Sequence, residues 1–350
     1  MKIEDARTKP TKLMQNYSSI QKFLHQIVLG NSFLARSLFE MEKSLFYKED
    51  KAINNAEHIF ITGLPRSGTT ILLKALYETG DFASLTYADM PFVLAPNLFS
   101  QFAAKSNLQA KEREQQDGIE HELNSPEAFD EVFFKHFSQD QSREELQSFI
   151  SLVLKKYQKQ RYLSKNNLNY QRVELISSVF PNAQFLIPFR EPLQHAYSLL
   201  KQHRRFCKLQ KQDSFVLKYM DLLGHNEFGL NHIAWNPAQQ YTDTFSINYW
   251  LEQWYMFYQN ILKDKSKQSS LVSYSKLCKS QEYRQALVTE LKLPELSTDF
   301  KLAQTDIQED YDRDLYTKSE ETYQILNRVL SKPINGSERT LPKSSILGLL

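Results

Sequence analysis

The chain has 350 residues, 41% of them hydrophobic, which is enough for one large α/β domain or two smaller domains with a sizeable core. Its 43 Lys and Arg against 41 Asp and Glu leave a formal charge of +2. The balance therefore points neither to a nucleic-acid partner nor to an anionic membrane surface, and any anion site must be local.

The cysteines and the N-terminal residues indicate the cellular compartment in which we expect the protein. Cys207 and Cys278 are far apart and lack metal-ligand spacing, which favours a reducing compartment over a disulfide scaffold. Residues 1–16 include acidic residues and no uninterrupted apolar stretch, so they do not resemble a secretory signal. No later segment is long and apolar enough to span a bilayer. We expect a cytoplasmic protein without a transmembrane segment.

The first predicted element is helical. Apolar residues recur at helical spacing over residues 18–47, and Gly30-Asn31-Ser32 interrupts the pattern. We assign residues 1–50 to a helical lead-in.

Two units of strand, turn and helix follow. In the first, a β-rich run at residues 58–62 leads into the glycine turn Gly63–Gly68 and a helical stretch over residues 69–78. In the second, an apolar run at residues 183–189 precedes a helical pattern that starts at Pro192, which suits the first position of a helix.

A third candidate strand covers Ser270–Tyr274. Strands separated by long helical segments predict a parallel sheet covered by helices, and hence an α/β fold of the phosphate-loop type. We assign residues 51–280 to its core and residues 281–350 to a C-terminal helical segment and tail of the same single domain. The polar stretch 101–117 and the aromatic-rich stretch 212–258 are predicted insertions that shape an acceptor pocket.

The first turn has the glycine spacing of a phosphate loop, in which backbone N–H groups and a helix N-terminus hold an anion. A loop that binds nucleoside triphosphates carries lysine after its last glycine. Here Thr69 stands at that place and Arg66 lies inside the loop, which weakens a kinase or NTPase interpretation. The alternative is a glycine turn that only joins a strand to a helix.

The string IFITGLPRSGTTILLKAL resembles the 5'-phosphosulfate loop of sulfotransferases that use 3'-phosphoadenosine-5'-phosphosulfate (PAPS). Its PRSGTT core is typical of tyrosylprotein and many bacterial members, and the landmarks of the resemblance run from Ile59 to Lys276. The resemblance implies the family's phosphate-loop fold and PAPS as donor, with Arg66 contacting the sulfate and the leaving phosphate oxygen. It assigns donor contacts to Pro65, Arg66, Ser67, Gly68, Thr69 and Thr70. The chemistry agrees, because a fixed guanidinium and aligned N–H groups stabilise the charge that develops on the departing phosphate oxygen.

The segment FPNAQFLIPFREPLQHAYSLL resembles the family's 3'-phosphate motif, with Arg190 at the strand's end and Ser198 on the following helix. Such a pair can converge on one phosphate, and the helix N-terminus would add its positive end. Alone, each residue would indicate only a surface charge or a helix-internal serine. Together with the phosphate loop they predict a nucleotide with phosphates at both ends.

Transfer also needs a cation and a base. The resemblance implies that Lys165 stabilises the sulfate, with a solvated surface lysine as the alternative. Cytosolic relatives place a catalytic histidine two residues later, where this chain has Asn167. Tyrosylprotein and Golgi-type relatives use a carboxylate downstream of the loop, and Asp89 lies near that position. We predict Asp89 as the base, with a turn-forming aspartate as the alternative.

His121 is the reserve base, since histidine titrates near neutral pH. It lies with Glu122 and Glu127 in DGIEHELNSPEAFDEVFF, which resembles a segment of bacterial sulfotransferases that act on glycans. A surface or capping histidine is the alternative.

Three further features carry weaker signals. Ser125 before Pro126 indicates a helix start. The pair His225 and Glu227 in LLGHNEFGL is a candidate of the same kind as His121. Tyr274 matches the position of an adenine-contacting tyrosine in the family, with a buried strand tyrosine as the alternative.

We therefore predict direct in-line transfer of a sulfuryl group from PAPS to an acceptor hydroxyl, without a metal, since arginine, lysine and helix N-termini can carry the charge. The glycan-type segment favours a carbohydrate acceptor, and small-molecule or peptide hydroxyls stay open. The alternatives are a phosphate-loop kinase or NTPase, against which Thr69 counts, and a non-catalytic nucleotide-binding protein. Acceptor identity and oligomeric state stay open.

Overall fold

The computed structural model describes residues 19–103, 124–137, 143–237, 239–263, 269–302 and 304–330. Five parallel strands form one sheet in the order β2-β3-β1-β4-β5, which confirms the predicted α/β fold. The strands are β1 (Ile59–Ile61), β2 (Phe82–Ala83), β3 (Arg161–Lys165), β4 (Gln184–Phe189) and β5 (Ser269–Ser273). β1, β4 and β5 match the three predicted strands. β2 and β3 were not predicted, because β2 has two residues and the short apolar run of β3 has a basic residue at each end.

The helices before β4 are α1 (Ser19–Gly30), α2 (Ser32–Phe46), α3 (Lys51–Asn54), α4 (Thr69–Tyr77), η1 (Tyr87–Asp89), α5 (Pro96–Ala103), α6 (Glu131–Phe137), α7 (Arg143–Tyr157), η3 (Asn169–Gln171) and α8 (Val173–Val179). Those after it are α9 (Pro192–Gln212), α10 (Ser214–Leu223), α11 (Ile247–Lys263), α12 (Tyr274–Lys279), α13 (Gln281–Glu290) and α14 (Arg313–Leu330). The predicted helical lead-in is present as α1 and α2, and the Asn31 side chain caps α2 by accepting from Leu34 N at 3.1 Å. None of the helices within the described ranges combines the length and apolarity that a bilayer crossing requires.

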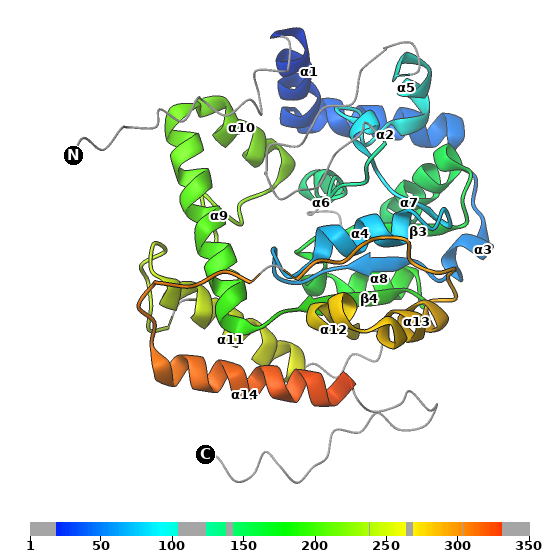
Figure 1. The fold of residues 1–350 in the computed structure, drawn as a ribbon. Helices are drawn as coiled ribbons and strands as arrows, with labels where there is room; N and C mark the ends of the chain where they lie inside the picture. Colours follow the sequence, from blue (N-terminus) through cyan, green and yellow to red (C-terminus); the bar gives the residue numbers. More distant parts are fainter. Residues whose placement is uncertain are drawn as a thin grey trace.

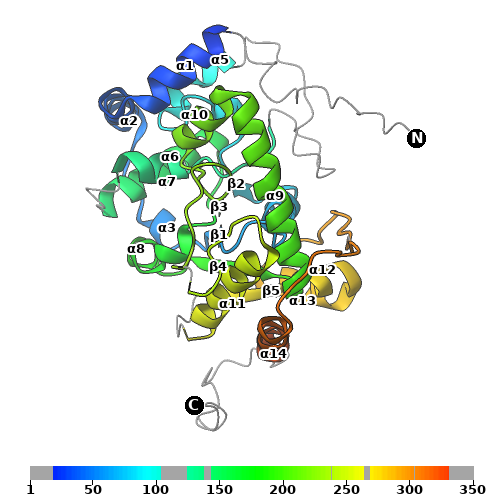
Figure 2. The ribbon, with the colours of Figure 1, turned by 90° about the vertical axis from the view of Figure 1, so that its left-hand side faces the viewer.

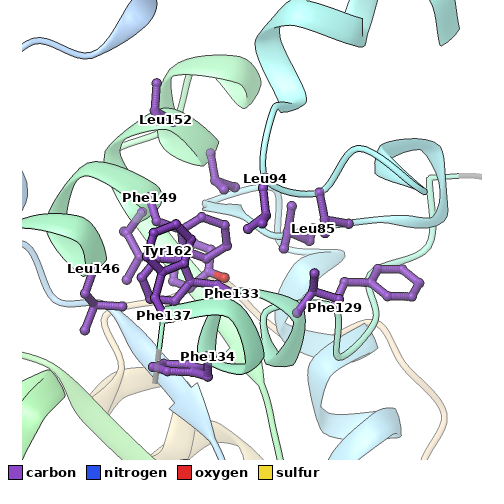
Figure 3. Close-up of a cluster of buried hydrophobic side chains, with 14 of the residues drawn as sticks. Leu85, Leu94, Phe129, Phe133, Phe134, Phe137, Leu146, Phe149, Leu152 and Tyr162 are labelled. Carbon is purple, nitrogen blue, oxygen red and sulfur yellow. The ribbon is translucent and has the colours of Figure 1, made fainter. Parts of the chain in front are cut away.

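Helices cover both faces of the sheet because successive side chains of a strand point to opposite sides. Phe60 lies in a buried cluster with residues of α2, α6, α7 and α8, where Phe133 and Phe149 stack at 4.6 Å between ring centroids. Figure 3 shows this cluster around Phe133, Phe149 and Tyr162. Ile59 and Ile61 face the other way, into a cluster with α4 and α13. Burial on both faces explains why β1 and β4 read as continuous apolar runs.

The carboxyl ends of all five strands meet at one edge, where ligands bind in open α/β sheets. The loop after β1, residues 166–168 after β3 and residues 190–191 after β4 share this edge. In Figure 2 the strand labels follow the sheet order, and α9 runs alongside them. Figure 1 shows α9 standing across the same end of the sheet, with α14 below it.

The aromatic-rich stretch predicted as an insertion contributes α10 and α11. The fully buried Trp250 and Trp254 of α11 pack in clusters with residues of α9, β4 and α14. Much of this stretch therefore packs against α9 as part of the hydrophobic core. Most of the other predicted insertion, residues 101–117, lies outside the described residues.

Candidate active site

The loop after β1 has the backbone of an anion cradle. Arg66 has φ 67° and Gly68 has φ 107°, both in the left-handed region. Gly68 stands at the N-cap of α4 and supplies no side-chain cap, so the first-turn N–H groups keep their outward-facing positive end. A Cβ on Gly68 would overlap the ring of Tyr274, which packs directly against the loop. Ser67 Oγ donates to Leu64 O at 2.7 Å and closes the turn.

His195 of α9 fixes this loop from the second motif. It is fully buried, and its Nε2 lies 2.8 Å from Pro65 O. Burial, with the nearby charges of Arg190 and Arg66, lowers the pKa of His195 to about 3, so the ring is neutral and Nε2–H donates to the carbonyl. His195 was not among the predicted site residues. Its place between Arg190 and Ser198 was the available signal.

The two predicted phosphate motifs meet. Arg190 Nη1 donates to Arg66 O at 3.1 Å, and Arg66 Nε donates to Ser198 Oγ at 3.3 Å. The Arg190 guanidinium also lies 5.3 Å from the centroid of the Tyr274 ring. Residues 124 positions apart in the chain, Arg66 and Arg190, thus share one site with the helical hydroxyl of Ser198.

The charge at this site is positive. Burial lowers the pKa of Arg190, although the guanidinium stays a cation. Among the residues that the structure describes, no carboxylate forms an ion pair with Arg190, and a half-buried guanidinium without such a partner is suited to an anionic ligand. The N-terminus of α9 makes no such contribution. The Glu191 carboxylate occupies it, accepting from Leu193 N at 3.1 Å and Gln194 N at 2.6 Å, which corrects the expectation that this helix end faces the phosphate.

Lys165 lies on the strand next to β1, at the same edge of the sheet as the loop. It is the last residue of β3 and lies in register with Ile61 of β1. Its Nζ is 3.6 Å from Glu127 Oε1, and both side chains are largely buried. Beyond it, Thr62 Oγ1 donates to Asn167 O at 3.3 Å, which ties the end of β3 to the residue before the loop.

A second polar cluster joins this edge. Asn167 Nδ2 donates to Glu227 Oε1 at 3.1 Å, and His225 Nδ1 lies 3.5 Å from the same oxygen. Lys165 and Glu127 are close enough to influence the charge of His225. Residues from three distant segments therefore surround the end of β3.

Glu127 reaches the cluster from an extended segment. Pro126 bridges to Thr86, and Glu127 N donates to Leu85 O at 3.1 Å. The predicted helix start at Ser125 is therefore wrong, because this backbone pairs with the chain after β2 and α6 begins only at Glu131.

Asp89 occupies a different environment. Its side chain has no exposed surface and forms an ion pair with Lys156. Its Oδ2 accepts from Thr86 N at 2.7 Å and from Tyr157 Oη at 2.7 Å. These partners belong to the segment after β2 and to α7, and none belongs to the phosphate loop. His121 lies outside the described residues.

A sequence model of the sulfotransferase family matches residues 58–290, which is more than half of the chain. The chain belongs to the sulfotransferase family. In this sulfotransferase the match spans β1 to α13 and so includes the phosphate loop, Lys165, the second motif and Tyr274. No curated protein matches the chain.

Solved sulfotransferases are also similar to this one. A sulfotransferase from Mycobacterium avium aligns over 91% of this chain and 79% of its own, with 12% identity and a TM-score of 0.44. One from Mycobacterium tuberculosis aligns over 91% and 89%, with 13% identity and a TM-score of 0.41. A sulfotransferase domain from the curacin biosynthetic pathway aligns over 69% and 76%, with 15% identity and a TM-score of 0.37. The family assignment rests on the sequence match.

Tyr274 of this sulfotransferase is not a strand residue. It begins α12, and its hydroxyl donates to Lys301 O at 2.9 Å. Its ring contacts Gly68 and lies beside Arg190, so it lies at the candidate anion site. Contact with adenine stays a prediction.

Proposed function

We propose that this sulfotransferase transfers a sulfuryl group from PAPS to an acceptor hydroxyl. The observation that carries the proposal is the pair of hydrogen bonds that joins the two motifs, Arg190 to Arg66 O and Arg66 to Ser198. Two anion-binding motifs in one site suit a nucleotide that carries phosphates at both ends.

The donor set fits such a nucleotide. The loop backbone, the uncapped N-terminus of α4 and Arg66 would hold the 5'-phosphosulfate, with Pro65, Ser67, Gly68, Thr69 and Thr70 completing the contacts. Arg190 and Ser198 would hold the 3'-phosphate, and the Tyr274 ring would lie beside the adenosine. Arg190, which has no carboxylate partner within the described residues, would then gain a counter-charge.

The chemistry is an in-line displacement at sulfur. As the acceptor oxygen bonds to sulfur, the bond from sulfur to the phosphate oxygen breaks and its electron pair remains on that oxygen. Arg66 would stabilise the charge that develops there, and Lys165 would balance the charge on the moving sulfuryl group. Lys165 is suited to this role because β3 presents it in register with the strand that carries the loop.

The acceptor side favours a polyhydroxylated compound. Ionic and amide groups lie at the edge next to the loop, and they belong to Glu127, Lys165, Asn167, His225 and Glu227. Such groups recognise hydroxyls by hydrogen bonding, and the glycan-type sequence segment includes one of them, Glu127. We therefore propose a carbohydrate hydroxyl as the acceptor.

Thermal unfolding in the presence of different nucleotides tests the donor. We expect 3'-phosphoadenosine-5'-phosphate to stabilise the chain by about 2.7 kcal/mol at 100 times its Kd, and 5'-AMP or ATP with Mg²⁺ to stabilise it much less. Equal protection by ATP with Mg²⁺ would instead support a kinase or NTPase. Turnover of PAPS against a panel of glycans then tests transfer, and bisphosphate binding without any turnover would indicate a binding protein.

A further inference from the structure

The polar cluster at the end of β3 contains a histidine whose surroundings prepare it for proton transfer. Asn167 takes the position two residues after Lys165, and its amide donates to Glu227, which in turn pairs with His225. His225 and Glu227 come from the segment between α10 and α11, far from Asn167 in sequence. The fold thus brings an imidazole to the edge beside the phosphate loop.

The segment that carries His225 is held firmly. Gly224 ends α10 with φ 74°, and His225 N donates to Met220 O at 2.9 Å, which completes a Schellman cap. A Cβ on Gly224 would lie 2.7 Å from Glu131 Cγ, so α6 packs tightly against this turn. Lys135 of α6 donates to the last carbonyls of α10. The backbone that carries the imidazole therefore has a defined position.

A second contact fixes the carboxylate partner. His232 Nδ1 lies 2.7 Å from Glu227 O, and its Nε2 lies 2.7 Å from Tyr249 Oη on α11. Glu227 is thus held through its backbone by His232 and through its side chain by Asn167. Such support is what a precisely oriented proton acceptor requires.

The two ring nitrogens of His225 have different surroundings. Nδ1 faces Glu227 Oε1 at 3.5 Å, and the side chain is 24% exposed. Within the described part of the chain, Nε2 has no hydrogen-bond partner. Asn167 Oδ1 is also buried without a partner among the described residues. An acceptor hydroxyl would meet a proton acceptor at Nε2 of the partly exposed ring.

We propose that His225 is the general base of the transfer, oriented by Glu227, an assignment that rests on the proposed function. The proton of the acceptor hydroxyl passes to Nε2 while the oxygen bonds to sulfur, and the phosphate leaves with the electron pair of the broken bond. Glu227 accepts from Nδ1–H and stabilises the imidazolium that forms. Asp89 cannot readily act in this way, because its carboxylate already accepts from Thr86 and Tyr157 and pairs with Lys156.

The charges around His225 agree with this role. Burial alone would lower the pKa of His225, but the charge and hydrogen bond of Glu227 raise it above its ordinary value. Lys165 opposes this effect and Glu127 adds to it. Burial alone would raise the pKa of Glu227, but His225 holds it at about 2, so Glu227 stays ionised. Since the base acts in its neutral form, turnover should rise as the pH passes upward through the raised pKa of His225.

The test is the pH profile of kcat/KM for PAPS-dependent transfer in the wild-type chain, His225→Gln, Glu227→Gln and Glu321→Gln. Glu321 is an exposed glutamate of α14 and serves as the matched control for Glu227. As a control, binding of 3'-phosphoadenosine-5'-phosphate is measured by thermal shift for each variant, and unchanged binding means that the fold and the donor site are kept.

We expect His225→Gln to lose at least about 100-fold in kcat/KM and to lose the acidic limb of the profile, while bisphosphate affinity stays within about threefold. Glu227→Gln should lose less in rate, and its acidic limb should move to lower pH, because the charge that raises the pKa of His225 is gone. Wild-type turnover in His225→Gln, or an unmoved limb in Glu227→Gln, would overturn the assignment. A wild-type chain that binds the bisphosphate and transfers nothing overturns the proposed function and this assignment with it.

Discussion

The proposed donor and acceptor sides of the site are built in opposite ways. Each half of the donor side is one contiguous unit of strand, turn and helix, β1 with α4 and β4 with α9. The acceptor side gathers single residues from the segment before α6, the end of β3 and the turn after α10. A contiguous unit leaves a recognisable string in the sequence, whereas an assembly of distant residues does not. The donor side was therefore the easier of the two to infer from sequence.

Arg66→Ala would break the donor side alone. We expect kcat to fall about 100-fold to 1,000-fold, because a fixed cation no longer meets the charge on the departing oxygen. The acidic limb of the pH profile should remain, since His225 is untouched. Steady-state kinetics over pH 5.5–8.5 would check this, and a variant that loses both rate and limb would show that the two sides are not separable.

Asp89→Asn would show whether Asp89 belongs to the proposed acceptor side or only stabilises the fold. We expect unfolding stability to fall by about 3 kcal/mol, because the variant leaves the half-buried Lys156 without its charged partner and weakens the cap at Thr86. Chemical denaturation measures this loss, and kcat per folded molecule is compared with wild type. If stability is unchanged and turnover disappears, Asp89 is the base after all.

Asp130→Asn tests the contact that holds the strand next to Lys165. Asp130 accepts from Ser164, the residue before Lys165, and burial raises the pKa of Asp130 to about 6. A raised carboxyl pKa means that the folded state holds the proton more tightly, so the contribution of Asp130 to stability is fully present below about pH 4 and is lost as the pH rises through about 6. This effect amounts to roughly 2 to 3 kcal/mol.

The asparagine variant should lack that fall, so its stability relative to wild type should increase between pH 4 and pH 6 and then level off. Denaturation curves at a series of pH values measure the difference. A difference that does not change with pH would show that Asp130 does not titrate in this range.

Particular residues show where the sequence sufficed. The glycine turn, Arg190 and Ser198 could be placed because local geometry fixes them once the strand and helix are recognised. The sequence also pointed to Lys165, although the strand that presents it was not predicted, because it has a basic residue at each end. Their roles in binding the donor and the sulfate stay predictions.

The rest depended on tertiary contacts. The Glu191 carboxylate caps the helix end that was expected to face a phosphate. The sequence alone does not show whether a glutamate before a helix caps its N-terminus or points away from it. His195 gained its role only from its contact with Pro65. His225 and Glu227 were noticed as a pair, but their meeting with Asn167 follows from how the turn after α10 packs on α6.

The central claim is that Arg66 and Arg190 grip opposite ends of one donor, and a matrix of variants and ligands tests it most directly. Calorimetric Kd values are measured for 3'-phosphoadenosine-5'-phosphate and 5'-AMP with wild type, Arg190→Gln and the exposed control Arg328→Gln. We predict that Arg190→Gln weakens the bisphosphate about 100-fold, about 2.7 kcal/mol, and leaves 5'-AMP nearly unchanged, because only the bisphosphate carries the 3'-phosphate. Equal weakening of both ligands, or of neither, would contradict the account.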